Sequence, residues 1–230
     1  MPVLPGSPPV EVHLKRSAKA RRFSLRVSRL DGRVTLSLPL RAREAEALEF
    51  LRGQEGWLRA TLRGMPDALV QGVAIGSVIS VEGRALTLAQ GSGRAVRVEG
   101  DLLLVPGDPG QAGVRVAAWL RVLARDRLAR ASGHYAGLLG RRYTRLTLRD
   151  TRSRWGSCSP TGALMYSWRL IMAPPAVLDY VAAHEAAHLV EMNHSAAYWA
   201  VVSSIYPGWQ HQRTWLHGHG QSLHRLRFGD

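Results

Sequence analysis

Cysteine is almost absent from this chain of 230 residues, in which Cys158 is the only one. A lone cysteine excludes an internal disulfide and suits a reducing compartment. The chain also lacks any run of 18 apolar residues, and Met1 to Pro9 has neither the basic start nor the apolar core of an export signal. We therefore expect no membrane span and a cytoplasmic location.

Acidic residues are scarce as well, with 17 against 31 basic residues and a formal charge of +14. The basic residues are 29 Arg and 2 Lys. A basic surface attracts polyanions and acidic substrates, and Arg pairs well with phosphate. Nucleic acid binding through this surface is one interpretation, and a coding bias toward Arg is the other. No compact basic block or nucleic-acid fold signature decides between them.

Histidine is plentiful, and three of the nine lie close together in the sequence. Residues 184–188 read His-Glu-Ala-Ala-His, and His194 follows. On a helix, His184 and His188 project from one face, one turn apart, so both imidazoles can bind one metal ion. Glu185 lies about 100° around the axis, where it can reach a water in the ion's open position. The motif predicts a hydrolase with one Zn²⁺ and Glu185 as its general base.

The sequence around the motif favours a helix from about 175 to 192. Pro174 and Pro175 suit its N-terminus, Asp179 favours the positive end of its dipole, and apolar residues recur at helical spacing. Ser195 is a candidate N-cap for a following helix that ends near Ile205.

A third ligand is expected, since catalytic zinc normally holds three protein groups. After Glu191 the only acid is Asp230, so one of these two or a histidine completes the site. His194 is preferred, because it is the nearest histidine beyond the helix and Asn193 tolerates a left-handed turn before it. The alternatives near the C-terminus are His211, His217, His219 and His224.

The histidine spacing matches the metzincin pattern, but position 191 is Glu where that pattern needs Gly, and no Met follows Met192. The wider motifs are Arg154-Trp155-Gly156-Ser157-Cys158-Ser159, Trp168-Arg169-Leu170-Ile171, Asp179-Tyr180-Val181, Asn193-His194-Ser195 and Tyr198-Trp199. With them the chain resembles the YgjP-like metallopeptidases, bacterial relatives of the SprT and WLM zincins. The resemblance implies zinc at His184, His188 and His194, Glu185 as the catalytic carboxylate, and a peptide or protein substrate.

Other residues near the motif are assigned more broadly. Tyr198, Tyr206 and Arg213 are candidates for stabilising an oxyanion or contacting substrate. Cys158 is expected to pack, because no neighbouring base is evident. Arg154 and Arg169 stay outside the catalytic set, although either could bind a substrate carboxylate or phosphate. Two other functions remain open, a DNA-associated peptidase and a non-enzymatic module stabilised by a closed four-ligand zinc site.

The chain as a whole predicts an α+β fold in three parts: a loose leader (1–9), a β-rich domain (10–110) and a zincin-like domain (111–230). The linker at 106–110 marks the boundary. The elements expected before it are a hairpin at 23–38 around Asp31-Gly32, a helix or broken helix at 43–63 and an antiparallel meander at 73–105. Those expected after it are a long helix at 117–135 and two strands, 143–149 and 164–171, that form a short sheet beside the zinc helix. That sheet is either a shelf for extended substrate or only packing for the helix.

Overall fold

The computed structural model describes residues 2–6, 8–28, 32–63 and 71–229. The chain forms two compact units, residues 1–70 and 71–230. This division differs from the predicted boundary after residue 110. The sheet of residues 78–106 belongs to the second unit, because its apolar face shares one hydrophobic core with the helices that follow it.

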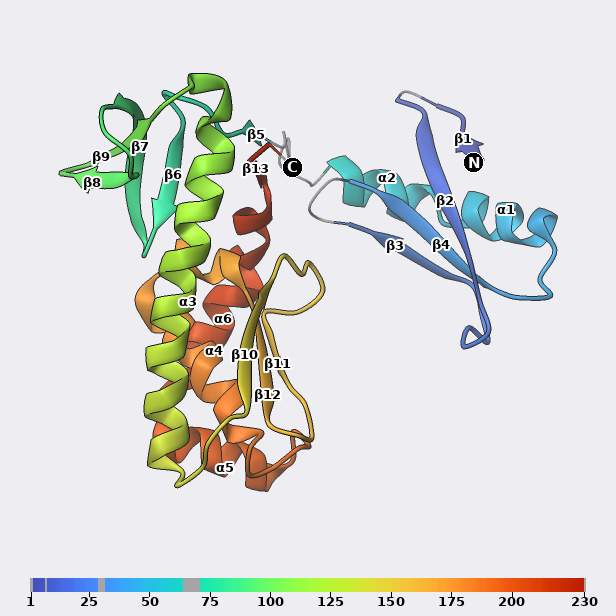
Figure 1. The fold of residues 1–230 in the computed structure, drawn as a ribbon. Coiled ribbons are helices and arrows are strands. Elements are labelled where there is room, and N and C mark those ends of the chain that lie inside the picture. Colours follow the sequence, from blue (N-terminus) through green and yellow to red (C-terminus); the bar gives the residue numbers. More distant parts are fainter. Residues whose placement is uncertain (1, 7, 29–31, 64–70, 230) are drawn as a thin grey trace. The chain divides into compact units, whose positions relative to one another are not determined.

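The first unit is a four-stranded sheet followed by two helices (Figure 1). Its elements are β1 (Val3–Leu4), β2 (Val10–Ser17), β3 (Ser24–Val27), β4 (Val34–Pro39), α1 (Glu44–Gly53) and α2 (Glu55–Arg63). The strand order is β1-β2-β4-β3, in which β2 and β4 are parallel and the other pairs antiparallel. Alternation along β4 buries Val34, Leu36 and Leu38 in the core shared with the helices and leaves Thr35 and Ser37 on the opposite face.

Two of three predictions for this unit are confirmed. β3 and β4 form the predicted hairpin, although Asp31 of its turn lies outside the described residues. The helical segment is broken at Gln54, between α1 and α2. The prediction that residues 1–9 form a loose leader is wrong, because β1 pairs with β2 and places Leu4 in the core, where it is 3% exposed. Two apolar residues are enough to extend the edge of the sheet.

The second unit contains two larger sheets along one long helix, α3, with further helices around them, and a two-stranded sheet of β5 and β13 (Figure 1). Its elements are β5 (Gln71–Gly72), β6 (Val78–Val81), β7 (Arg84–Gly91), β8 (Arg97–Glu99), β9 (Leu102–Pro106), η1 (Pro109–Gln111), α3 (Ala112–Leu138), β10 (Arg145–Arg149), β11 (Gly156–Cys158), β12 (Ala163–Ser167), η2 (Trp168–Met172), α4 (Pro175–Ala187), α5 (Ala196–Ile205), α6 (Trp209–His219), η3 (Gly220–His224) and β13 (Leu226–Arg227). The fold is α+β, as predicted. None of the helices within the described residues combines the length and apolar character needed to cross a bilayer.

The first sheet of this unit is not the predicted antiparallel meander. Its strand order is β6-β7-β9-β8, and β7 and β9 run parallel. The apolar strand β9 takes the inner position, with Leu103 and Val105 buried, whereas all three residues of β8 are exposed at the edge. Burial of the more apolar strand β9 therefore favours a sheet of two hairpins, β6-β7 and β8-β9, joined by the parallel pairing of β7 with β9.

The second sheet has the order β10-β12-β11 and includes both predicted strand regions. β12 ends at Ser167, however, and the predicted strand residues from Trp168 to Ile171 belong to the 3₁₀ helix η2. Every residue of η2 is buried. A short apolar run of this kind does not distinguish a buried strand from a buried helical turn.

Candidate functional site

The predicted metal-binding residues lie on α4 and in the connection to α5. Pro175 occupies the first turn of α4, and Val177 and Val181 are among the residues that bury the helix in the core. The helix ends earlier than predicted, since His188 is its C-cap. Tight backbone hydrogen bonds then turn the chain, including Leu189 N to Ala186 O at 2.9 Å.

This turn brings His194 back to the helix without the predicted left-handed residue. Among the described non-glycine residues only Glu82 has a positive φ, so Asn193 does not use that conformation. The N-cap prediction for α5 is confirmed, because the Ser195 hydroxyl accepts a hydrogen bond from Tyr198 N at 3.3 Å. This cap lies one residue after His194 and fixes the start of α5 at Ala196.

His184, His188 and His194 converge on one point. One ring nitrogen from each lies within 4.8 Å of the others, and the Nε2 atoms of His184 and His194 are 3.1 Å apart. Two imidazoles on one tetrahedral zinc, at Zn–N distances of about 2.1 Å, place their nitrogens roughly 3.4 Å apart. The cluster therefore fits a zinc ion in ligand chemistry and in scale. Within the described part of the chain, no fourth His, Cys, Asp or Glu joins it.

Neighbouring groups hold these rings in place. His188 Nδ1 lies 2.9 Å from the carbonyl oxygen of Glu191, which suits the tautomer that donates from Nδ1 and leaves Nε2 for a metal. The ring of Tyr198 stacks on His188 at 4.5 Å, and its hydroxyl donates to the backbone oxygen of His184 at 2.9 Å. Burial, with His188 and His194 nearby, lowers the pKa of His184 to about 3. His184 therefore stays neutral, the form that binds metal.

Glu185 is buried between α4 and the edge strand β11, with 4% of its surface exposed. A Cβ added at Gly156 would lie 2.5 Å from Glu185 Oε1, so the carboxylate packs directly on the backbone of β11. Burial raises the pKa of Glu185 to about 8, although nearby Arg154 opposes the rise. A carboxyl group with a raised pKa beside a metal cluster is suited to accept and return a proton near neutral pH.

The three candidates for oxyanion or substrate contact lie in different places. The Tyr198 hydroxyl is engaged with His184, and the Tyr206 hydroxyl donates to Ala176 O at 2.8 Å, at the other end of α4. The Arg213 guanidinium lies 5.1 Å from the Trp199 ring centroid, and its charge contributes to the lowered pKa of His184. Of the three, Arg213 is the one whose polar group has no backbone partner in the described residues, and it lies over the rings of Trp199 and Trp209.

The alternative ligands lie elsewhere. None of the four C-terminal histidines belongs to the described metal cluster, and Asp230 lies outside the described residues. His224 is buried against the ring of Trp155 at 5.0 Å. Burial, with Arg169 nearby, lowers the pKa of His224 to about 4.

Cys158 and Arg169 have structural surroundings. Burial, with the charge of Glu185 nearby, raises the pKa of the Cys158 thiol to about 11, which disfavours the nucleophilic thiolate. Arg169 forms two hydrogen bonds to Asp150, at 2.7 and 3.0 Å, and also donates to the carbonyls of Leu223 and Leu226. Although burial opposes it, this guanidinium holds the pKa of Asp150 below its usual value.

Sequence reasoning missed the helix α6 and the contact made by Gly156. Trp209 and Arg213 of α6 approach the metal cluster through Trp199. The sequence of this helix has no clear apolar stripe from which it could be predicted, and none of its residues is fully buried. Gly156 lies in a strand, where its missing side chain makes room for Glu185.

An α+β unit with three converging histidines and a buried glutamate on one helix has the constellation of a metal-dependent hydrolase. The model of one protein family, described as YgjP-like, metallopeptidase domain, matches residues 21–219. The chain therefore belongs to the YgjP-like metallopeptidase family, which confirms the resemblance noted from its motifs. Among curated proteins and among solved structures, nothing matches the chain.

Proposed function

We propose that this protein is a zinc-dependent peptidase in which Glu185 is the general base. The observation that carries the proposal is the convergence of His184, His188 and His194 beside the buried carboxylate of Glu185, which shares α4 with His184. The absence of a fourth ligand among the described residues supports an open catalytic position over a closed structural site. The family match supports a peptide or protein substrate.

Several residues of the chain would each have a separate role in the hydrolysis. When bound, zinc would polarise the scissile carbonyl and make a coordinated water more acidic. Glu185 would accept the proton of that water and return it to the leaving amine. Its contact with Gly156 would hold the carboxylate against β11, and His188 would keep its Nε2 available through its bond to the Glu191 carbonyl. Of the three candidates for oxyanion or substrate contact, Arg213 is the one proposed to contact the substrate.

The edge strand β11 is the candidate shelf for an extended substrate. Among the described strands β11 pairs with β12 alone, so its other edge has backbone groups available to a peptide. Gly156 of this strand touches Glu185. A peptide that added a strand here would therefore pass the general base, with main-chain hydrogen bonds setting its register.

The test is a comparison of the wild-type chain with Glu185→Gln. We expect the variant to retain one zinc per chain and to lose peptide cleavage by about 10²- to 10⁴-fold, the usual contribution of a general base. Zinc content by mass spectrometry and cleavage of a quenched peptide library are the measurements. Undiminished cleavage by the variant would contradict the assigned role.

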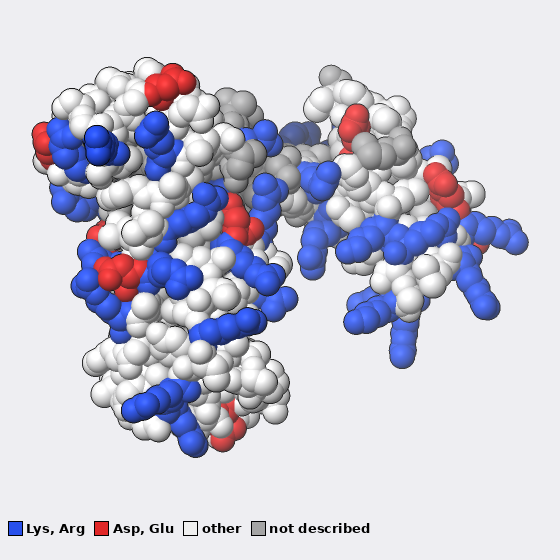
Figure 2. All heavy atoms as spheres, in the orientation of Figure 1, with Lys and Arg blue, Asp and Glu red and all other residues white. Residues whose placement is uncertain are grey.

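A second candidate function, a peptidase for proteins bound to nucleic acid, is favoured by the charge on the first unit. Residues 10–43 carry ten basic and two acidic residues, whereas 44–63 carry three and four. Lys15, Arg26 and Arg33 line a hollow of about 530 Å³ on the sheet face opposite the helices, together with Thr35 and Ser37. Lys and Arg also outnumber Asp and Glu on the visible face of each unit (Figure 2).

This candidate predicts salt-sensitive binding to a DNA duplex, measured by fluorescence anisotropy. Replacing Lys15 and Arg26 by Glu should weaken binding at least about tenfold, because phosphate contacts dominate nonspecific affinity. The matched control replaces Arg52 and Arg63 of the helices by Glu and should have a smaller effect. Equal losses in the two variants, or no binding near physiological salt, would dismiss the candidate.

A further inference from the structure

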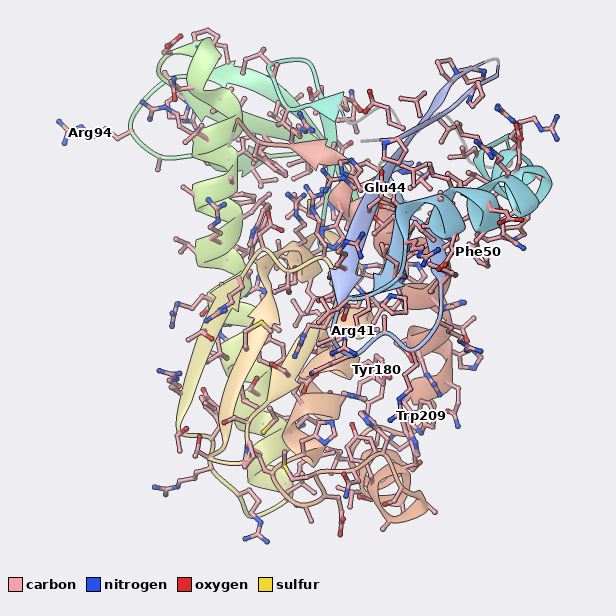
Figure 3. All side chains as sticks on the ribbon, turned by 90° about the vertical axis from the view of Figure 1, so that its right-hand side faces the viewer. Arg41, Glu44, Phe50, Arg94, Tyr180 and Trp209 are labelled. Carbon is pink, nitrogen blue, oxygen red and sulfur yellow. The ribbon has the colours of Figure 1, made fainter. Side chains whose placement is uncertain are left out.

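A cavity of about 730 Å³ lies beside the metal cluster in the second unit. Its walls come from three segments: residues 152–155 before β11, Tyr180 of α4, and residues of α6 and η3 that include Trp209 and Arg213. Tyr180 and Trp209 lie close together in Figure 3, and their rings stack with centroids 6.5 Å apart. We name this space the arginine cavity, after Arg152, Arg154 and Arg213 in its lining.

The arginine cavity borders the metal cluster through two of its walls. The ring of Tyr180 lies 5.9 Å from that of His184. Trp209 stacks at 4.1 Å on Trp199, whose ring lies 5.9 Å from that of His194. A peptide held at the metal could therefore place a side chain near its scissile bond in this cavity.

The charged side chains that line the cavity are all basic. Its lining includes three arginines and no aspartate or glutamate. Within the described residues, neither Arg154 nor Arg213 forms an ion pair within 4 Å of a carboxylate, although the charge of Arg154 acts on nearby Glu185. The guanidinium of Arg213 lies over the rings of Trp199 and Trp209, at 5.1 and 5.7 Å. This cation–π contact uses the face of the guanidinium and leaves its N–H groups for a planar anion.

The rest of the lining suits a short apolar stem that ends in this anion. Trp155, Tyr180 and Trp209 supply apolar ring surface, and Thr214 and Gln210 supply hydrogen-bonding groups. A glutamate or aspartate side chain combines such a stem with a carboxylate, which matches guanidinium geometry. A lysine or arginine side chain would meet like charges.

We propose that the arginine cavity binds an acidic side chain of the peptide substrate, and that Arg213 and Arg154 determine a preference for Glu or Asp near the scissile bond. This inference rests on the proposed peptidase function and specifies its substrate class. The two arginines act as specificity residues, whereas the proton transfer is assigned to Glu185.

The first test uses the zinc-loaded full chain and pairs of quenched peptides that differ only in Glu against Gln. At one subsite we expect kcat/KM to favour Glu by about ten- to a hundredfold, the usual effect of a charge-assisted hydrogen bond. Arg213→Gln and Arg154→Gln should each reduce this ratio. Arg213→Glu should favour Lys at the same subsite. The control Arg141→Gln, an equal charge change at an exposed residue outside the lining, should leave the ratio unchanged.

The second test reads binding without cleavage. Peptide titrations of the zinc-loaded Glu185→Gln variant, followed by Trp fluorescence, should give the same preference for Glu, because Trp155 and Trp209 line the cavity. Cleavage without preference for acidic residues would overturn the inference and leave the proposed function intact. Selective binding without any cleavage by the wild type would instead contradict the function. Tighter binding of adenosine monophosphate or inorganic phosphate than of the acidic peptide would also overturn the inference.

Discussion

The metal cluster and the arginine cavity are neighbours of opposite character. The cluster consists of three imidazoles held by α4 and the short connection to α5, and the carboxylate of Glu185 lies on the same helix as two of them. Burial keeps His184 neutral and raises the pKa of Glu185 to about 8. The cavity next to it is cationic and is assembled from three separate segments. The comparison suggests that bond cleavage and substrate selection depend on different residues, which mutations can separate.

The largest expected effect comes from removing a metal ligand. His194→Ala should lose stoichiometric zinc and reduce kcat/KM by at least about 10³-fold, because two imidazoles remain and the metal contributes several kcal/mol to the reaction. Binding of acidic peptides to the arginine cavity should persist, since His194 is not in its lining. Metal analysis, peptidase assays and fluorescence titration measure these effects.

The matched control for this prediction is His211→Ala. His211 is an exposed histidine of α6 that belongs neither to the metal cluster nor to the lining of the cavity. It should leave zinc content and cleavage unchanged. The reverse pattern, with zinc lost on replacing His211 and kept on replacing His194, would refute the ligand assignment.

A second prediction separates a structural arginine from those of the cavity. Arg169→Met should lower the free energy of unfolding by about 3–5 kcal/mol, because it leaves Asp150 without its partner and removes donors to two carbonyls. Chemical denaturation provides the measurement. The double variant with Asp150→Asn should recover part of the loss. A change below about 1 kcal/mol, or an altered Glu-to-Gln preference in the folded variant, would contradict this division of roles.

A third prediction concerns the strand that supports Glu185. Gly156→Ala should retain zinc but reduce kcat by about 10²-fold, since its Cβ would displace the carboxylate and small misplacements of catalytic groups are costly. Its Glu-to-Gln preference should change little. The matched control is Gly133→Ala in α3, where a Cβ meets nothing within 4 Å. Equal rates in the two variants would show that the contact between Gly156 and Glu185 is unimportant.

The metal cluster could be predicted from the sequence because its residues are close together in the chain, whereas the arginine cavity could not. His184, Glu185 and His188 could be identified because helical periodicity alone places them together, and His194 is only six residues further on. The long helix, the break at Gln54 and the Ser195 cap also follow from local patterns. Such features need no knowledge of distant contacts.

Features that depend on distant segments were wrong or missed. The pairing of β7 with β9 depends on which strand buries more apolar surface, and β1 is fixed by pairing with β2. Gly156 and Glu185 are 29 positions apart, and only the packing of β11 on α4 brings them together. The arginine cavity was missed for the same reason, since Arg154 and Arg213 become neighbours only in the folded unit.

The smallest expected effect comes from removing one of two similar tyrosine hydrogen bonds, which lie at opposite ends of α4. Tyr198→Phe removes the hydroxyl that donates to His184 O but keeps the ring stacked on His188. One hydrogen bond of about 1 kcal/mol corresponds to roughly fivefold weaker zinc binding. Tyr206→Phe removes a similar bond to Ala176 O, far from the ligands along the helix, and should leave zinc affinity unchanged. Competition with a chromogenic chelator measures both affinities. A loss of cleavage above about 100-fold in zinc-saturated Tyr198→Phe would instead favour direct contact of this hydroxyl with the substrate.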